Sequence, residues 1–129
     1  WPNNDAGSDL VSKGLRMFKE KYPEENFHFF RNFSPEDYAS VLANAKCAVG
    51  NSSSFIREGS YLGTPVVMIG DRQKGRESDR NVKWVPYQKE AIQDAIKEQV
   101  SHGLHATSKL FGNGNSGVKI ADTIAAILG

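Results

Sequence analysis

The sequence predicts an α/β fold in which helices cover both faces of a parallel sheet. Short apolar runs with the character of buried strands alternate along the chain with segments of helical periodicity. That alternation is typical of parallel sheets, in which each strand reaches the next through a helix. The chain has 129 residues, which suffices for one domain with a hydrophobic core and is short for two. We therefore expect residues 1–129 to form a single three-layer lobe.

The first quarter of the chain should hold a helix followed by a strand. Residues 1–8 are polar and turn-forming, and apolar side chains at helical spacing then predict a helix over residues 9–21. Pro23 and the glutamates after it end that helix. Residues 27–30 read Phe-His-Phe-Phe, a composition that favours a strand with its phenylalanines in the core.

A second helix has a start signal at residues 34–37, Ser-Pro-Glu-Asp. The serine is an N-cap residue, the proline suits the first helical position, and the aspartate stands three residues after the cap. Phe33 and Tyr38 occupy the two positions of a hydrophobic staple. We expect this helix to continue to about Ala45.

The remaining elements follow from the same patterns. Apolar runs predict strands, amphipathic segments predict helices, and glycine or proline separates them. In order, we expect a strand over residues 47–50, a helix that starts at three serines and ends at Gly63-Thr64-Pro65, a strand over 66–70, a polar loop over 71–80, a short strand over 82–85, and helices over 90–100 and 118–128.

Composition narrows the class of protein. The net charge is +1, with 16 basic and 15 acidic residues, so nothing favours nucleic acid or another strongly charged partner. His28, His102 and His105 have no metal-binding spacing, and we expect neither a metal nor a cofactor. Cys47 lies in an apolar run and is interpreted as a core residue, and a single cysteine fits a reducing compartment. No segment resembles a membrane span or a signal peptide, so we expect a cytoplasmic protein.

The most informative stretch is the predicted strand–turn–helix unit around Ser52, Ser53 and Ser54. Free amide N–H groups and the positive end of the helix dipole meet at a helix start and favour an anion there. Glu58 lies too far into the helix to cap it, and its carboxylate suits the hydroxyls of a ribose. These residues predict a nucleotide-diphosphate site. The alternative is an ordinary serine-capped helix with a surface glutamate.

Arg72 follows the next predicted strand, and its planar donor fork suits a phosphate. The alternative is a solvated loop charge, which is our interpretation of Arg76 and Arg80. The Ser52 turn, the Arg72 loop and the Phe33 loop all follow predicted strands, so they should share the carboxyl edge of the sheet, where ligands of such folds bind. The sequence carries no motif for nucleophilic catalysis, no Walker-type loop and no dinucleotide fingerprint. We expect a binding site without its own acid or base.

Five blocks of the sequence occur in the same order in one enzyme family. They are Trp-Pro-Asn-x-Asp-Ala-Gly-Ser at residues 1–8, Gly-Asn-Ser-Ser-Ser-x-x-Arg-Glu at 50–58, Gly-Thr-Pro at 63–65, Gly-x-Arg-Gln-x-Gly-Arg at 70–76 and Gly-Asn-Gly-Asn at 112–115. Together they resemble the C-terminal domain of hydrolysing UDP-N-acetylglucosamine 2-epimerases. That family includes bacterial sialic-acid pathway enzymes and the epimerase half of the bifunctional animal epimerase/kinase.

This resemblance implies the C-terminal Rossmann-like lobe of a GT-B fold. The nucleotide would lie in a cleft between this lobe and an N-terminal lobe absent from the chain. The expected UDP contacts are Ser52 and Ser53 at the diphosphate with Ser54 beside them, Glu58 at the ribose, Arg72 at the nucleotide, Asn3 on the nucleotide side, and Phe33 at a position whose backbone meets the uracil.

The family reaction converts UDP-N-acetylglucosamine and water to N-acetylmannosamine and UDP, by elimination of UDP and then hydration with inversion at C2. It serves the biosynthesis of sialic and related nonulosonic acids. In the family, the groups that move the proton belong to parts absent from this chain. We therefore expect no catalytic residue here, no activity of the chain alone, and a homo-oligomer for the complete protein.

Three positions depart from the family pattern, since Phe55 replaces a frequent Gly, Asp71 a frequent Thr and Asn113 the usual Asp. They leave the sugar open, including diacetamido sugars. Other interpretations are a non-hydrolysing epimerase, a GT-B glycosyltransferase and, outside the enzymes, a flavodoxin-like nucleotide-binding module. A non-hydrolysing epimerase typically carries Asp-Ser-Gly-Gly where residues 51–54 of this chain are Asn-Ser-Ser-Ser.

Overall fold

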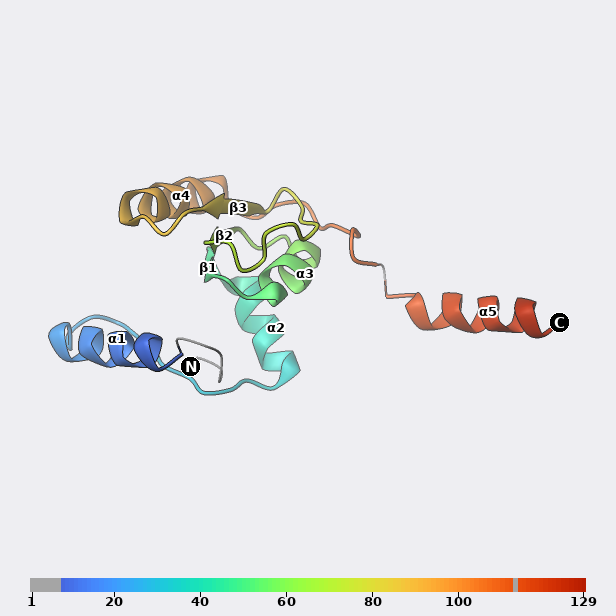
Figure 1. Cartoon of the computed structure of the whole chain (residues 1–129), viewed down its shortest axis with the longest axis horizontal. Helices are drawn as coiled ribbons and strands as arrows, with labels where there is room; N and C mark the ends of the chain where they lie inside the picture. The colour runs from blue at the N-terminus through green and yellow to red at the C-terminus, as the bar shows by residue number, and fades with distance from the viewer. Residues whose placement is uncertain (1–7, 113) are drawn as a thin grey trace. The chain divides into compact units, whose positions relative to one another are not determined.

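The computed structural model of the chain describes residues 8–112 and 114–129 (Figure 1). Contacts divide the chain into two compact units, Trp1–Tyr38 and Ala39–Gly129. The expected nucleotide contact Asn3 and the turn residue Asn113 lie outside the described residues. Within the part of the chain that is described, no helix is long and apolar enough to cross a membrane.

The first unit contains helix α1, Ser8–Lys21, where the sequence predicts a helix. The strand predicted over residues 27–30 is wrong. No described strand pairs with this segment, and a strand needs a hydrogen-bonding partner. Its phenylalanines do not enter a core either, because Phe27 and Phe30 are 47% and 53% exposed. Phe27 instead packs edge-on against Phe18, with ring centroids 4.9 Å apart.

Helix α2, Pro35–Asn44, begins as its start signal predicts. The amide of Asp37 donates to Ser34 Oγ at 3.1 Å, so Ser34 is the N-cap residue. The ring centroids of Phe33 and Tyr38 lie 6.4 Å apart, which confirms the hydrophobic staple. The aromatic ring of Phe33 therefore has a local structural role.

The second unit is built on a parallel sheet of three short strands. They are β1, Ala48–Gly50, β2, Val66–Ile69, and β3, Val82–Val85. Their spatial order is β1-β2-β3, and the first residue of β2 lies opposite the first residue of each neighbour. All three strands lie within the ranges predicted from the apolar runs.

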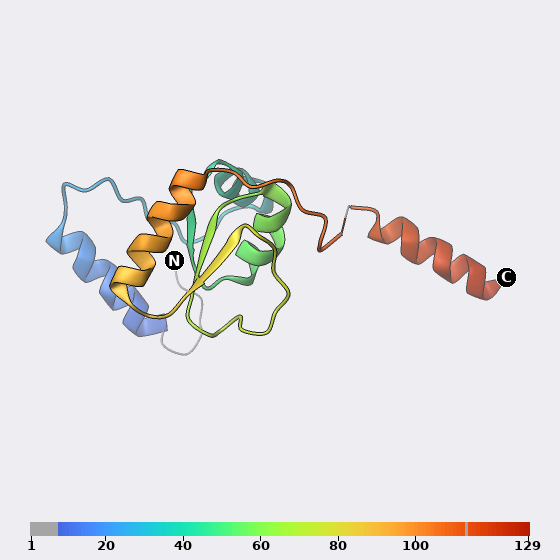
Figure 2. The same ribbon diagram turned by 90° about the horizontal axis from the view of Figure 1, so that it is seen from above.

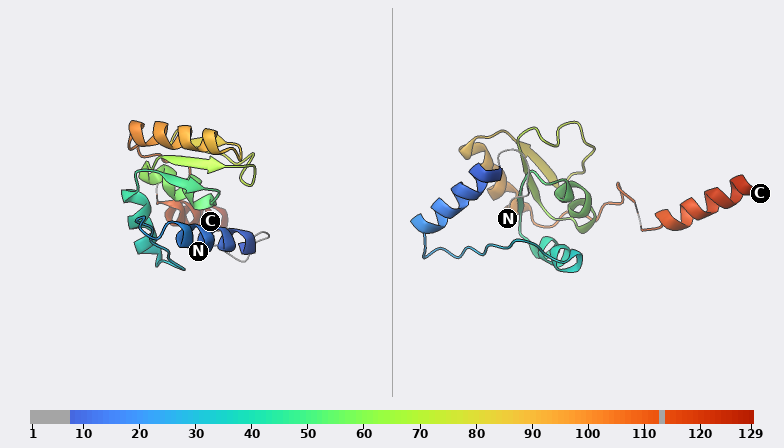
Figure 3. Two further views of the ribbon diagram at one scale, coloured as in Figure 1. Left: turned by 90° about the vertical axis from the view of Figure 1, so that its left-hand side faces the viewer. Right: turned by 60° about the horizontal axis from the view of Figure 1, so that its bottom comes forward.

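Three helices belong to this unit. Helix α3, Ser53–Leu62, links β1 to β2, and helix α4, Lys89–His102, follows β3. Both pack on β2 and β3, and Figure 3 shows the sheet between them. Helix α5, Ser116–Leu128, has no buried residue. The predicted three-layer, Rossmann-like α/β arrangement is thus confirmed.

The core lies on both faces of β2. Val67 packs with Ala95 of α4 on one face. Because side chains alternate along a strand, Val66 and Met68 point to the other face. Helix α3 covers that face, and a Cβ at its Gly59 would lie 3.5 Å from Val66 Cγ2. Val66, Val67 and Met68 are 0% exposed. Burial of each such side chain contributes about 1.5–3 kcal/mol to stability, so β2 is the strand that holds the unit together.

The amino-terminal edge of the sheet is held by one buried amide, that of Gln99 in α4. Its Nε2 donates to the carbonyls of Val66 and Asn81 at 2.8 and 2.9 Å. These bonds orient the amide, so Gln99 Oε1 accepts a hydrogen bond from His105 Nε2 at 3.1 Å. The amide of His105 donates to Gly63 O at 2.8 Å. The segment after α4 is thereby tied to the sheet and to the end of α3.

The end of α3 at Gly63 generates a stability prediction. Gly63 has a φ of 73°, and a Cβ there would lie 2.1 Å from the carbonyl oxygen of His105. Gly63→Ala should therefore lower the free energy of unfolding by at least ~2 kcal/mol, from backbone strain plus a clash. Gly75→Ala is the matched control, because Gly75 has a φ of 83° but open space, and strain alone costs about 1 kcal/mol. Urea denaturation measures both losses, and equal losses would contradict the clash.

The amino-terminal edge also carries a titratable group. Burial, and then the charge of His102, lower the pKa of His105 from its ordinary value of 6.5, while Asp79 opposes them. The rings of His102 and His105 are stacked, with centroids 3.9 Å apart. The pKa of Asp79 is itself lowered from 3.8, chiefly by its bond from Ser108, so Asp79 titrates below the range of the histidine.

Acid should therefore destabilise the chain through His105. Because the pKa of His105 is lower in the folded state, the unfolded chain binds more protons. The contribution of neutral His105 to the free energy of unfolding is therefore complete above about pH 6.5 and is lost as the pH falls through the lowered pKa. We expect the Tm to fall between about pH 7.5 and about pH 5.5. It should fall less in His105→Gln, whose amide can still donate to Gln99. An identical pH dependence of Tm in the two proteins would overturn this assignment.

Candidate functional site

The two predicted ligand loops leave the same edge of the sheet. β1 ends at Gly50 and β2 at Ile69, and the two strands are parallel neighbours. The serine turn, residues 51–54, follows the first strand, and the loop of residues 70–81 follows the second. In Figure 2 this loop passes the start of α3. The carboxyl edge of the second unit thus brings the three serines and Arg72 to one side of the sheet.

Ser52 caps α3. Its backbone is extended, with φ of −76° and ψ of 136°, and its Oγ lies 3.4 Å from the amide nitrogen of Ser54 and 2.8 Å from Ser54 Oγ. The 3.4 Å bond is long for an N–H donor. The dipole of the ten-residue helix favours negative charge at the same place. The serine cap and an anion are therefore compatible in one turn.

Phe55 lies against the end of the strand that enters this turn. A Cβ at Gly50 would be 3.2 Å from Phe55 Cε2, so the glycine admits the close approach of the ring. Phe55 is one of the positions that depart from the family pattern. The aromatic ring therefore lies against Gly50, directly before the serine turn.

Gln73 joins the two loops; it belongs to the Gly-x-Arg-Gln-x-Gly-Arg block at residues 70–76, where no role is expected of it. Its Nε2 donates to the backbone carbonyl of Asn51 at 3.0 Å, and the residue is only 5% exposed. The glutamine stands among charged residues in a loop, a setting that is typical of solvated side chains. The sequence carries no local signal that this amide turns inward.

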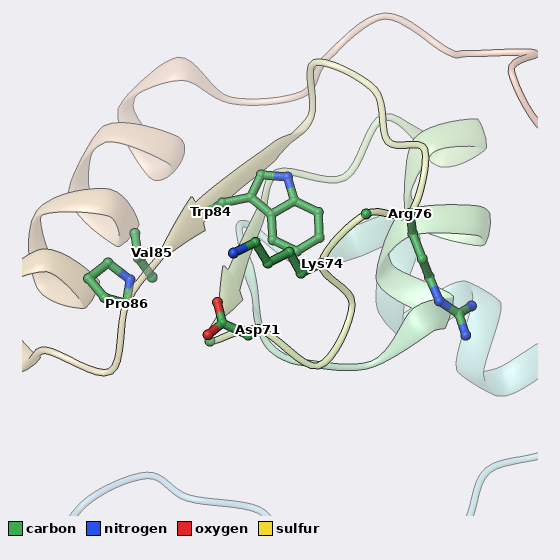
Figure 4. Close-up of a pocket in the computed structure, with 8 residues that line it drawn as sticks. Asp71, Lys74, Arg76, Trp84, Val85 and Pro86 are labelled. Carbon is green, nitrogen blue, oxygen red and sulfur yellow. The ribbon is translucent and has the colours of Figure 1, made fainter.

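Arg76 lies on the same loop and comes close to the start of α3. It lines a cavity of about 180 Å³ at the start of α3, together with Ser53 and Arg57. Figure 4 shows the side chain of Arg76 directed to the α3 side of the loop. Arg76 is exposed, which agrees with its interpretation as a solvated loop charge, although the loop brings the residue beside Ser53. Two guanidinium groups, those of Arg57 and Arg76, thus border the helix start.

A larger cavity of about 460 Å³ opens at the carboxyl ends of β2 and β3 (Figure 4). Trp84 forms one wall, is 37% exposed, and its Nε1 donates to Ser78 Oγ at 3.4 Å. Asp71 and Lys74 add one charge of each sign. Sequence reasoning missed Trp84 because it lies inside a predicted strand; a large aromatic residue in so short an edge strand was the available signal. The full lining is Gly70, Asp71, Lys74, Gly75, Arg76, Trp84, Val85 and Pro86.

The remaining residues expected to contact the nucleotide are Glu58, Arg72 and Phe33, and they lie on three different segments of the chain. Glu58 lies on the exposed surface of α3, one and a half turns after Ser52. Arg72 is exposed at the start of the 70–81 loop. Phe33 belongs to the first compact unit. Ser52, Ser53, Ser54 and Glu58 therefore share one helix, and Arg72 lies on the loop that Gln73 ties to it.

The described residues also bear on the interpretation of the cysteine. Burial raises the pKa of the Cys47 thiol, and the side chain packs beside the core of Val67 and Ala95. This environment disfavours the thiolate and agrees with a core residue. Among residues 8–112 and 114–129, no group of three histidine, cysteine or acidic side chains is arranged to hold a metal ion.

Comparison with known proteins agrees with this architecture. Residues 1–125 match the model of a family described as UDP-N-acetylglucosamine 2-epimerase. The chain is 32% identical over 116 residues to a UDP-N-acetylglucosamine 2-epimerase of Neisseria meningitidis serogroup B, which covers 90% of this chain and 30% of that protein. It is similar over a shorter stretch to two further bacterial proteins.

One of these is the polysialic acid biosynthesis protein P7 of Escherichia coli, with 36% identity over 90 residues, or 70% of this chain and 22% of the relative. The other is a hydrolyzing GDP/UDP-N,N'-diacetylbacillosamine 2-epimerase of Campylobacter jejuni, with 37% identity over 83 residues, or 62% of this chain and 21% of the relative. The chain thus spans less than a third of the length of these relatives. Since the family match runs through nearly all of the sequence and through both ligand loops, the chain belongs to the UDP-N-acetylglucosamine 2-epimerase family.

Proposed function

We propose that this chain is the UDP-binding lobe of a hydrolysing UDP-N-acetylglucosamine 2-epimerase, with the GT-B placement that its sequence resembles. The observation that carries the proposal is the serine-capped start of α3 at the carboxyl edge of the sheet, next to the Arg72 loop. The nucleotide sugar is inferred from membership of the epimerase family. The activity belongs to the complete polypeptide, to which this chain contributes nucleotide binding.

The diphosphate binds at the start of α3. The hydroxyls of Ser52 and Ser53 and the first amides of the helix donate to phosphate oxygens, and the helix dipole adds attraction for negative charge. Arg72 supplies a charge-assisted donor from the neighbouring loop. The Glu58 carboxylate, further along α3, accepts from the ribose hydroxyls. Asn3 and the backbone of Phe33 remain predictions for the uridine side.

Elimination of UDP develops negative charge on the diphosphate as the bond to C1 of the sugar breaks. Donors that already point at the oxygens stabilise this charge more in the transition state than in the bound substrate, and so accelerate the step. Hydration of the resulting glycal gives N-acetylmannosamine. The groups that remove and return the C2 proton are assigned to the complementary lobe.

Support for the hydrolysing type comes from the serine turn, Asn-Ser-Ser-Ser at residues 51–54, and from the Campylobacter jejuni relative, whose name carries that reaction type. Its diacetamido substrate and the ring of Phe55 beside the serines make the sugar a point to test. We further propose that the complete enzyme is a cytoplasmic homo-oligomer with a second lobe that closes over the nucleotide.

Nucleotide binding is tested by calorimetry on the complete polypeptide. UDP should bind, and ADP should bind more weakly. Glu58→Gln should lower the affinity for UDP roughly tenfold or more, because it removes the charged group that accepts hydrogen bonds from the ribose hydroxyls. With 2′-deoxy-UDP the effect of Glu58→Gln should shrink. Glu90→Gln, at an exposed glutamate in the first turn of α4, is the charge-matched control and should bind UDP like the unsubstituted protein. Equal affinities for UDP and ADP would contradict a uridine site.

The reaction type is tested by proton NMR of the complete polypeptide with UDP-N-acetylglucosamine. We expect free N-acetylmannosamine and UDP in equal amounts, because hydrolysis releases both. UDP-N-acetylmannosamine as product would instead identify a non-hydrolysing epimerase. Consumption that requires an added acceptor would identify a glycosyltransferase. Turnover of a diacetamido sugar alone would keep the reaction and change the substrate.

A further inference from the structure

Two glutamines are buried to the same extent but differ in how many of their side-chain hydrogen-bonding groups have a partner. Gln73 and Gln99 are both 5% exposed. The amide of Gln99 has a partner for each of its functions, since Nε2 donates to two carbonyls and Oε1 accepts from His105. Gln73 Nε2 donates to Asn51 O, but no described residue donates to its Oε1, which is buried as well.

The lack of a donor for Gln73 Oε1 indicates that this side chain does not serve to stabilise the fold. A buried acceptor without a donor costs free energy, whereas an apolar side chain of similar shape would be neutral or stabilising at the same place. The carbonyl that accepts its one hydrogen bond belongs to Asn51, which is only partly buried. The bond must therefore matter through what it connects.

What it connects are the two halves of the ligand edge. Asn51 lies between the last residue of β1 and the N-cap Ser52. Gln73 follows Arg72 in the next loop, 22 residues further along the chain. One hydrogen bond of 3.0 Å therefore sets the position of the serine turn relative to the loop that carries Arg72 and Arg76. A diphosphate held from both sides needs that spacing to be correct before it binds.

We propose that Gln73 is a positioning residue, whose buried amide clamps the serine turn to the Arg72 loop in the spacing that a nucleotide diphosphate requires. The assignment rests on the proposed UDP site and adds a residue to it that makes no contact with the ligand. It predicts that affinity and stability respond to Gln73 in opposite ways, which distinguishes a positioning role from a structural one.

The test compares Gln73→Met with Gln99→Met in the complete polypeptide. Methionine is similar in length to glutamine and has no amide, so each variant removes the hydrogen bonds and keeps the volume. Gln73→Met should weaken UDP roughly tenfold, as loss of a supporting residue does at other sites, with a Tm equal to or above that of the unsubstituted protein. Gln99→Met should lower the Tm, because it removes the bonds to Val66 O and Asn81 O and takes away the acceptor of His105 Nε2. It should leave the UDP affinity of the folded protein unchanged.

Gln73→Glu adds a pH-dependent rescue. The ionised carboxylate cannot donate to Asn51 O, whereas the protonated acid can, and burial favours the protonated form. The UDP affinity of Gln73→Glu relative to the unsubstituted protein should therefore recover as the pH falls from about 7.5 to about 5.5. The same ratio for Gln73→Met should not change with pH.

The outcomes separate this inference from the proposed function. If the unsubstituted protein does not bind UDP, the proposed function fails, and with it the ligand for which Gln73 is assigned. If it binds UDP and Gln73→Met binds within twofold of it, the UDP site stands and the positioning role is overturned. If Gln73→Met lowers the Tm as Gln99→Met does and loses no affinity in the folded fraction, Gln73 is structural and the inference is wrong.

Discussion

The pairing of β2 with a parallel strand on each side is the interaction on which the rest of the second unit depends. The side chains of β2 are fully buried at Val66, Val67 and Met68, so the strand contributes to the hydrophobic core on both faces of the sheet. Its backbone is hydrogen-bonded to β1 and to β3. Parallel pairing sends the chain out of every strand at the same edge. The serine turn, the Arg72 loop and the Trp84 cavity are neighbours for that reason alone. Their chemistry follows from a geometry that hydrophobic residues impose.

The amino-terminal and carboxyl edges of this sheet differ in how completely their buried amides are hydrogen-bonded. At the amino-terminal edge, Gln99 and Asn81 are buried with their hydrogen-bonding groups paired to backbone and side chains. At the carboxyl edge, the buried amide oxygen of Gln73 has no donor among the described residues. The proposed nucleotide site therefore lies at the edge opposite the one where the buried amides are paired.

Sequence patterns predicted the elements that depend on local chemistry. Ser34, Gly63 and the apolar run of β2 each carry their own signal, and the cap, the helix end and the strand are found where expected. Residues 27–30 failed because β propensity is realised only beside a partner strand. Ser52 and Arg72 could be identified as candidates, since each follows a strand. The buried amide of Gln73 and the cavity beside Trp84 could not be predicted, because both depend on how the 70–81 loop folds back on the sheet.

The position of Trp84 gives the protein an internal optical reporter. Its indole is partly exposed, lies in the wall of the larger cavity, and is hydrogen-bonded to Ser78 of the same loop that begins with Arg72 and Gln73. A change in the position of that loop alters the polarity around the ring and so its emission wavelength. The chain has one other tryptophan, Trp1. In a Trp1→Phe variant, the indole fluorescence therefore follows events at the carboxyl edge without any attached label, and its time course would give the rates at which the loop moves.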